Sequence, residues 1–230
     1  TCSARSSNGR GMNHVVPEII PAILAHSQAE AFQYDQAANE AEWIQVDCLD
    51  GHFLPNTSFY DPTSWPTQGP NIELHLMCEN PQRVIEAWRA HPRCKRAVWH
   101  AELSIDHEQL LEWCASHELE AGIALNPETS LERVHSLVPR LDMLLFLFLH
   151  PDWSDQPLIP TVNEYSREAH PLPPALPLGV DGGVEADLIP ELAELGITRF
   201  YTASRVFHQQ HLSPREALHT LQHIAQTACI

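Results

Sequence analysis

Three residues of the types that carry acid–base and metal chemistry, Asp47, His75 and Asp181, lie inside short apolar runs typical of β-strands. Successive side chains of a strand alternate between its two faces, so residues two apart share a face. Gln45 therefore points the same way as Asp47, and Met77 the same way as His75. Two carboxylates and an imidazole that meet at a pocket are suited to bind a divalent metal ion, to exchange protons, or both.

Eight such runs alternate along the chain with segments of helical pattern, which indicates parallel strands joined by crossover helices. The runs are EIIPAIL from Glu18, WIQVDCL from Trp43, IELHLM from Ile72, RAVWHAE from Arg96, EAGIALN from Glu120, MLLFLFL from Met143, PLGVDGG from Pro177 and RFYTAS from Arg199. We therefore expect an α/β fold, a single (β/α)8 TIM barrel over residues 16–230. An open doubly wound sheet is the alternative, but the first connection lacks the glycine-rich turn of that fold.

A barrel of this kind brings the carboxyl ends of all its strands to one mouth. This rule selects Asp47, His75 and Asp181 as the residues expected to converge. The inner layers of a barrel are usually apolar, so any one of the three could be a buried structural residue. All three together are harder to explain that way, because two buried aspartates without partners would cost several kcal/mol. Asp50, His100, Glu102 and Asn126 also lie in or just after strands at this end.

Helix signals vary in quality. Asp106 with Gln109 has the spacing of a capping pair, and Thr129 with Glu132 that of a capping box. One apolar stripe in the last helix is formed by Ala217, Leu221, Ile224 and Ala228. The connections after the second and sixth runs are rich in proline and polar residues, and predict little helix.

Charge and composition limit the function classes. Thirteen Lys and Arg against thirty Asp and Glu leave a net charge of −17, which opposes binding to nucleic acid. No apolar run is long enough to cross a bilayer, so the expected partner is a small molecule and not a membrane. The six cysteines form no CxxC pair, which favours free thiols and a cytoplasmic location. Residues 1–15 have no apolar segment like that of a signal peptide and are expected to be a disordered tail. The sequence does not decide whether the protein forms a homo-oligomer.

Four segments resemble, in order and spacing, the signature blocks of the ribulose-phosphate 3-epimerase family. They are WIQVDCLDGHFLPN from Trp43, LHLMCENP from Leu74, ALNPETSLE from Ala124 and VDGGV from Val180. The set is specific, whereas NP or GG alone would mean little. The resemblance covers about residues 18–208 and implies a barrel of the ribulose-phosphate-binding type.

The resemblance implies a metal-dependent 3-epimerase acting on a ketose or ketose phosphate. Two aspartates then exchange protons at carbon 3 through an enediolate, and one divalent ion (Zn, Mn, Mg or Fe) stabilises the charge. Carried over residue by residue, the catalytic pair is Asp47 and Asp181. The implied metal ligands are Gln45, Asp47, His75 and Asp181, and the implied substrate-binding residues are Met77, Gly182, Gly183 and Ser204.

Two departures from the family pattern bear on metal and substrate. Gln45 stands where the family has a histidine ligand, and its amide oxygen is a harder donor that favours Mg or Mn over Zn. The segment 150–156 stands where the family has a glycine-rich phosphate loop, and it carries Asp152 and Asp155 instead of glycines. Carboxylates there would repel a phosphate, which predicts that an unphosphorylated ketose binds comparably to, or better than, its phosphate ester. Ala203 and Ser204 replace a Gly-Ser pair.

Two other readings remain. A barrel whose metal site has decayed would be a sugar-binding or regulatory protein. A lyase or decarboxylase on the same fold would normally use a lysine at the mouth, but the chain has one lysine, Lys95, at the wrong end of its strand.

Overall fold

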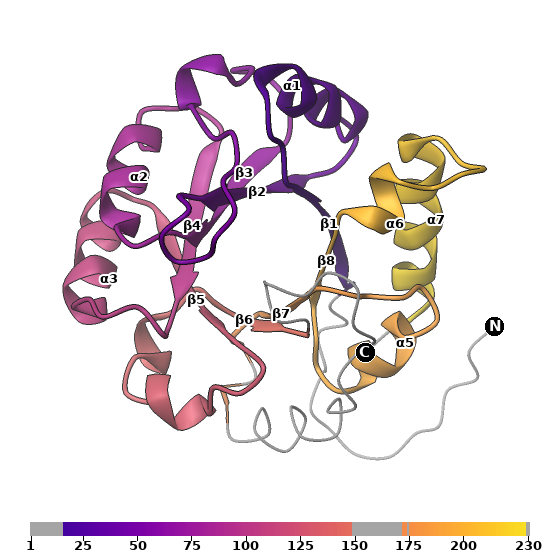
Figure 1. The fold of residues 1–230 in the computed structure, drawn as a ribbon. Coiled ribbons are helices and arrows are strands. Elements are labelled where there is room, and N and C mark those ends of the chain that lie inside the picture. Colours follow the sequence, from indigo (N-terminus) through magenta and orange to yellow (C-terminus); the bar gives the residue numbers. More distant parts are fainter. Residues whose placement is uncertain (1–15, 149–171, 174, 229–230) are drawn as a thin grey trace, which may run out of the picture.

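The chain folds as a barrel in the computed structural model, which describes residues 16–148, 172–173 and 175–228. Eight parallel strands close in sequence order, β1 beside β2 and so on to β8, which pairs again with β1. Figure 1 looks along the barrel axis and shows the helices around the outside. The predicted (β/α)8 barrel is confirmed. The expected tail at 1–15 and the altered loop at 150–156 lie outside the described residues.

All eight predicted strands are present, and each begins within two residues of its predicted start. The strands are β1 Glu18–Ile23, β2 Trp43–Leu49, β3 Asn71–Met77, β4 Cys94–His100, β5 Glu120–Leu125, β6 Met143–Leu147, β7 Leu178–Asp181 and β8 Arg199–Thr202. The described α-helices are α1 Gln28–Ala37, α2 Pro81–Trp88, α3 His107–Ser116, α5 Ile189–Glu194, α6 Ser204–Phe207 and α7 Pro214–Thr227. Short 3₁₀ helices are η1 Pro62–Ser64, η2 Leu131–Val134 and η3 Val138–Arg140.

Of the two predicted helix caps, the one at Asp106 is confirmed and the one at Thr129 is wrong. Asp106 caps α3 by accepting from the Gln109 backbone N–H. The capping box at Thr129 does not form, because the side chain of Ser130 caps the 3₁₀ helix η2 while Thr129 hydrogen-bonds to Glu102. Ser213, whose role the sequence analysis did not predict, forms a capping box at the start of α7.

The predicted stripe of α7 packs on the barrel. Ala217 and Leu221 are buried, and Ile224 and Ala228 are partly buried against the same core. The connection between β2 and β3 contains only η1, in agreement with its proline-rich sequence. Within the described part of the chain, no helix combines the length and apolar character needed to cross a bilayer. The four cysteines in this part are free thiols.

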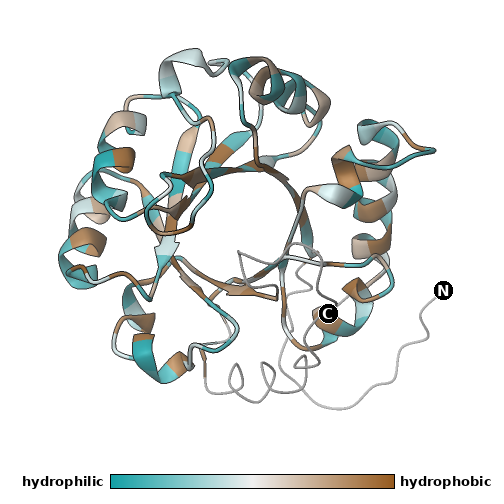
Figure 2. Ribbon diagram, viewed as in Figure 1, coloured by the Kyte–Doolittle hydropathy of each residue, from teal (hydrophilic) through white to brown (hydrophobic). Residues whose placement is uncertain are grey.

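Two separate cores follow from the alternation of side chains along the strands. Outward residues such as Val46, Leu74 and Trp99 are fully buried beneath the helices. A smaller cluster, which includes Ile20 and Leu145, fills the barrel interior. Figure 2 shows strands that are hydrophobic over most of their length, with some polar positions, and helices with polar outer faces. The barrel is therefore a packed core and its chemistry is confined to the mouth.

One inner layer of the barrel is charged. Arg96 Nη1 donates to Glu73 Oε2 at 2.7 Å, and Tyr201 Oη donates to the same oxygen at 3.0 Å. Arg96 Nη2 lies 2.6 Å from Glu120 Oε2 at the barrel's edge. Arg96 and Glu73 have exposed fractions of 1% and 0%, so each neutralises a charge that water cannot reach. Glu73 precedes His75 by two residues on β3, so this layer lies directly beneath the predicted site.

Two glycines make room for this filled interior. A Cβ at Gly122 would lie 2.6 Å from Met143 Cγ, and one at Gly179 would lie 2.7 Å from Tyr201 Cε2. These separations are below normal carbon contacts, so glycine at both positions lets the large inner side chains pack.

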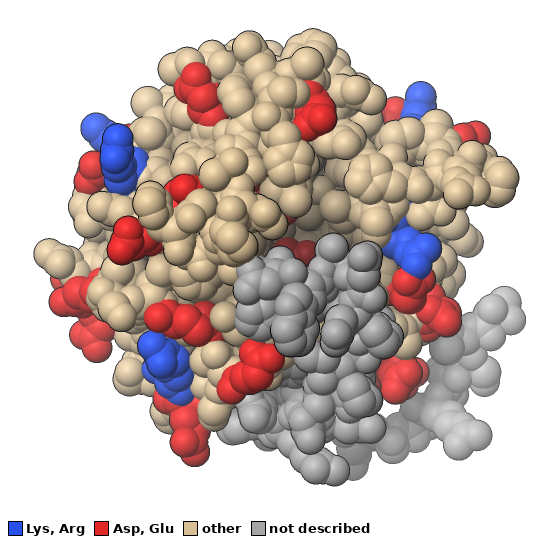
Figure 3. All heavy atoms as spheres, viewed as in Figure 1, with Lys and Arg blue, Asp and Glu red and all other residues tan. Residues whose placement is uncertain are grey.

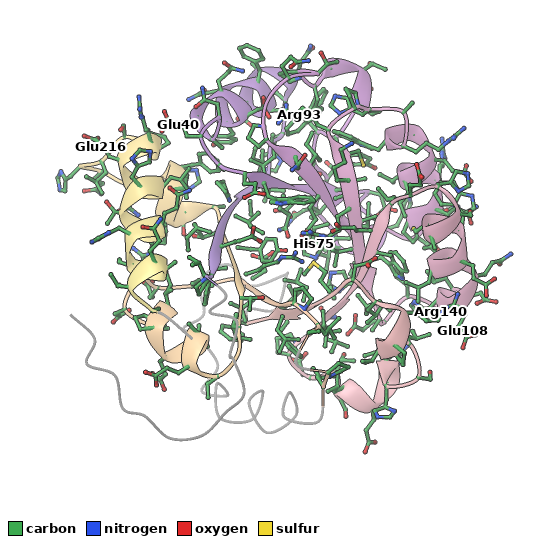
Figure 4. All side chains as sticks on the ribbon, turned by 180° about the vertical axis from the view of Figure 1, so that it is seen from behind. Glu40, His75, Arg93, Glu108, Arg140 and Glu216 are labelled. Carbon is green, nitrogen blue, oxygen red and sulfur yellow. The ribbon has the colours of Figure 1, made fainter. Side chains whose placement is uncertain are left out.

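Replacing Arg96 by Met should leave Glu73 buried without its ion-pair partner. We expect the free energy of unfolding to fall by about 3–5 kcal/mol, the usual cost of breaking a buried ion pair. Urea unfolding measures this change. As a control, Arg140→Met breaks the exposed pairing with Glu108, both labelled in Figure 4, and Glu112, and should cost less than about 1 kcal/mol. Equal losses in the two variants would contradict the inner ion pair as a major contributor.

Candidate active site

The three predicted residues meet at the mouth of the barrel. Asp47 on β2 and His75 on β3 are direct neighbours in the strand register, and Asp181 ends β7. One potential ligand atom from each residue lies within 4.8 Å of the others. His75 Nδ1 lies 3.3 Å from Asp47 Oδ1 and 3.5 Å from Asp181 Oδ2. Figure 4 shows His75 inside the ring of strands. We call these three residues the triad.

Gln45 joins the triad from the same face of β2. Its amide nitrogen donates to Asp47 Oδ1 at 3.0 Å and to Asp181 Oδ2 at 2.8 Å, so one amide bridges both carboxylates. Among the described residues, the Gln45 Oε1 atom is buried and has no hydrogen-bond partner. If the amide is turned over, this oxygen points towards the two carboxylates and could coordinate a cation bound between them. The donor set of two carboxylates, one imidazole and one amide oxygen therefore fits a divalent metal ion.

Burial and neighbouring charges change the pKa values of Asp181 and His75. Burial, followed by the nearby Asp47 charge, raises the pKa of Asp181 to about 6, although His75, Gln45 and the Gly182 backbone N–H all oppose this. Burial alone would lower the pKa of His75, but Asp47 and Asp181 outweigh it and raise that pKa. The site therefore attracts positive charge, which a proton or a metal ion can supply.

A second histidine lies behind the triad. His75 Nε2 is 3.0 Å from His100 Nε2, and His100 Nδ1 is 3.3 Å from Glu102 Oε2. Burial lowers the pKa of His100 to about 4. Burial would raise the pKa of Glu102, but hydrogen bonds from His100, Thr129 and the Asn126 backbone N–H lower it to about 2. His100 is thus neutral and Glu102 charged near neutral pH.

The interpretation of the sequence placed His100 and Glu102 near the mouth but gave them no role. His100 ends β4 and Glu102 follows it by two residues, and this H-x-E spacing was the available signal. Asp50, another residue near the mouth, is used differently. Its carboxylate accepts from the backbone N–H groups of His52, Phe53 and Glu79, which ties the loop after β2 to the end of β3.

The predicted substrate-binding residues lie around the mouth. Met77 ends β3, two residues beyond His75, and packs with Leu49 and Leu54 in a small apolar cluster. Phe53 packs against this cluster and also lies 4.8 Å, centroid to centroid, from the His100 ring. This cluster forms an apolar wall beside the triad.

Residues after β7 and β8 form another part of the rim. Gly182 and Gly183 have positive φ angles of 92° and 62°, a conformation that glycine adopts without strain. Ser204 begins α6 directly after β8. Arg205, the next residue, pairs with Glu185, so its charge is already engaged by a carboxylate. Figure 3 shows several acidic side chains on the face that surrounds the mouth and few basic ones.

Lys95 is exposed near the start of β4, whereas the triad lies at the carboxyl ends of the strands. A lyase that depends on a lysine at the mouth is therefore not supported by the one lysine of the chain.

Comparison with known proteins places this geometry in a family. Residues 14–207 match the model of the ribulose-phosphate 3 epimerase family. Ribulose-phosphate 3-epimerase of Mycobacterium tuberculosis is 31% identical over 199 residues, which cover 83% of this chain and 86% of that protein. The protein of the same name from Chlamydia pneumoniae is 28% identical over 222 residues, covering 89% and 92%.

Solved structures agree on the fold. A 3-hexulose-6-phosphate synthase superposes with a TM-score of 0.68 at 11% identity, covering 90% of this chain and 99% of that one. A thiamine phosphate pyrophosphorylase from Pyrococcus furiosus gives a TM-score of 0.62 at 15% identity, covering 94% and 98%. The family match spans most of the barrel, from before β1 to the end of α6, and so includes every residue of the triad. The chain therefore belongs to the ribulose-phosphate 3-epimerase family, a family of isomerases that act on carbohydrates.

Proposed function

We propose that this protein is a metal-dependent 3-epimerase of a ketose or a ketose phosphate. The observation that carries the proposal is the triad, since two carboxylates and an imidazole converge at the mouth of a barrel whose relatives are named epimerases. Gln45, Asp47, His75 and Asp181 would hold one divalent ion. When bound, the ion would stabilise negative charge that develops on the substrate oxygens.

Asp47 and Asp181 are the proposed acid–base pair. One carboxylate removes the proton from carbon 3, and the other returns a proton to the opposite face of the planar enediolate. In the metal-free chain the pKa of Asp181 is raised to about 6, which brings it closer to neutral pH and suits a group that both takes up and releases a proton. His75 lies against both carboxylates and helps to fix their positions.

The substrate would lie between the triad and the rim. Met77 would pack against its carbon skeleton, and the backbone and hydroxyl groups of Gly182, Gly183 and Ser204 would bind its far end. Arg205 is paired with Glu185, which leaves less positive charge for a phosphate group at this rim. Free ketoses therefore belong in the assay beside ribulose 5-phosphate.

A barrel that only binds sugars is the alternative, and the bridging Gln45 amide is the observation that favours it.

Replacing Asp47 or Asp181 by Asn should remove one proton-transfer group each. We expect turnover to fall by about 10²–10⁴-fold in either variant, with the fold retained. Exchange of the carbon 3 proton with D2O, followed by NMR on ribulose 5-phosphate and on free pentuloses, measures each half of the reaction. Arg140→Met is the matched surface control. Full turnover by Asp181→Asn would refute the proposed pair, and no exchange by the parent on any ketose would favour the binding protein.

Replacing Gln45 by His should exchange an amide for an imidazole ligand. We expect zinc affinity to rise by about tenfold or more, because imidazole is the better donor for zinc, while magnesium affinity should not rise. Calorimetric titration with each ion measures this. No gain for zinc would show that the residue at position 45 does not face the metal.

The raised pKa of Asp181 should make the free energy of unfolding of the metal-free protein depend on pH. Its pKa is about 6 in the folded chain and near 3.8 ordinarily, so the folded state holds an extra proton between these values. The free energy of unfolding should then fall as pH rises from about 4 to about 6, by roughly 3 kcal/mol at most. Urea unfolding with chelator present, compared with Asp181→Asn, isolates this contribution. Parallel pH curves for both proteins would contradict the raised pKa.

A further inference from the structure

The contacts behind His75 form a continuous chain of donors and acceptors. Glu102 lies at one end, His100 in the middle and His75 at the other. The two imidazole planes are 18° apart with centroids separated by 5.1 Å, while their Nε2 atoms are only 3.0 Å apart. The edges that carry Nε2 therefore face each other, which is the geometry of a hydrogen bond between rings.

Glu102 fixes the direction of this chain. Its carboxylate already receives the Asn126 backbone N–H at 3.0 Å and the Thr129 side chain. An ionised carboxylate only accepts hydrogen bonds, so the His100 nitrogen that faces it must carry the proton. His100 is then protonated on Nδ1, and its Nε2 is left as an acceptor.

That acceptor in turn orients His75. Because His100 Nε2 is the acceptor, the proton of the 3.0 Å contact lies on His75 Nε2. His75 Nδ1 is then the ring nitrogen left to ligate a metal ion, which would displace any proton on it, and this atom faces Asp47 and Asp181 at 3.3 and 3.5 Å. His100 is fully buried and His75 2% exposed, so water cannot easily replace either partner.

We propose that Glu102 and His100 are positioning residues, which hold His75 with its Nδ1 lone pair aimed at the metal position between Asp47 and Asp181. This inference rests on the proposed function only in taking the triad as the metal site. Residues that orient a ligating histidine typically change metal affinity by about 10–100-fold when they are replaced. Here a second histidine transmits the effect of the carboxylate.

The test reads the proton positions directly. Long-range ¹H–¹⁵N NMR of ¹⁵N-histidine-labelled protein should show His100 protonated on Nδ1, with and without zinc. Loss of the signals in His100→Gln assigns them. In Glu102→Gln the amide can donate to His100 Nδ1, so the proton should move at least partly to Nε2. A parent protein with His100 protonated on Nε2 would overturn the inference.

Zinc affinity, measured by calorimetry with zinc alone, is the second readout. We expect losses of about 10–100-fold in Glu102→Gln and in His100→Leu. His100→Gln keeps an acceptor near the His75 Nε2 position and should recover most of the affinity. Glu108→Gln, on the exposed face of α3, is the matched control and should bind zinc like the parent. Unchanged affinity in both Glu102→Gln and His100→Leu would overturn the positioning role.

These results separate the two proposals. Neither readout needs substrate, so a parent that binds zinc with the expected proton pattern but does not epimerise any ketose would refute the function and keep the positioning role. A parent that epimerises a ketose, with zinc affinity unchanged in Glu102→Gln and His100→Leu, would keep the proposed function and refute the positioning role.

Discussion

Charges inside the barrel must find their partners inside the barrel, because water is excluded from its packed interior. Two layers obey this constraint in different ways. In the lower layer Arg96 pairs with Glu73, so the buried acid has a cation beside it. In the upper layer Asp47 and Asp181 are two acids served by one histidine and one amide, so positive charge is in deficit. Removing one partner of the lower pair would leave a buried charge alone, whereas the upper layer can take up a proton or a cation.

Three groups could compensate the negative charge of Asp47 and Asp181: a metal ion, a proton or the Gln45 amide. They compete, because each would occupy the same carboxylate oxygens. A proton on Asp181 is favoured by burial, the Gln45 amide already bridges both acids, and a divalent ion would neutralise both at once. The choice of glutamine lowers the number of strong metal donors by one compared with histidine. If the proposed ion binds, its identity and the acid strength of Asp181 would depend on the same few contacts.

The fold is shared far beyond the family, and the residues at the mouth decide the chemistry. Barrels that share this fold at 11–15% identity carry the names of a synthase and a pyrophosphorylase. In this chain the mouth has acids and histidines, while its one lysine lies at the opposite end of β4. The geometry suits proton exchange on a substrate more than covalent attachment through an amine.

What the sequence by itself determined is local. The strands, the shared face of Gln45 and Asp47, and the Asp106 cap all depend on residues within a few positions of one another, and all were predictable. The rule that all strand ends of a barrel meet at one mouth selected the triad, and the family blocks implied the roles of its residues. Contacts between residues far apart in the sequence could be seen only in the folded barrel. The pairing of Arg96 with Glu73, the chain from Glu102 through His100 to His75, and the use of Thr129 on Glu102 instead of a helix cap all depend on register, which no local pattern encodes.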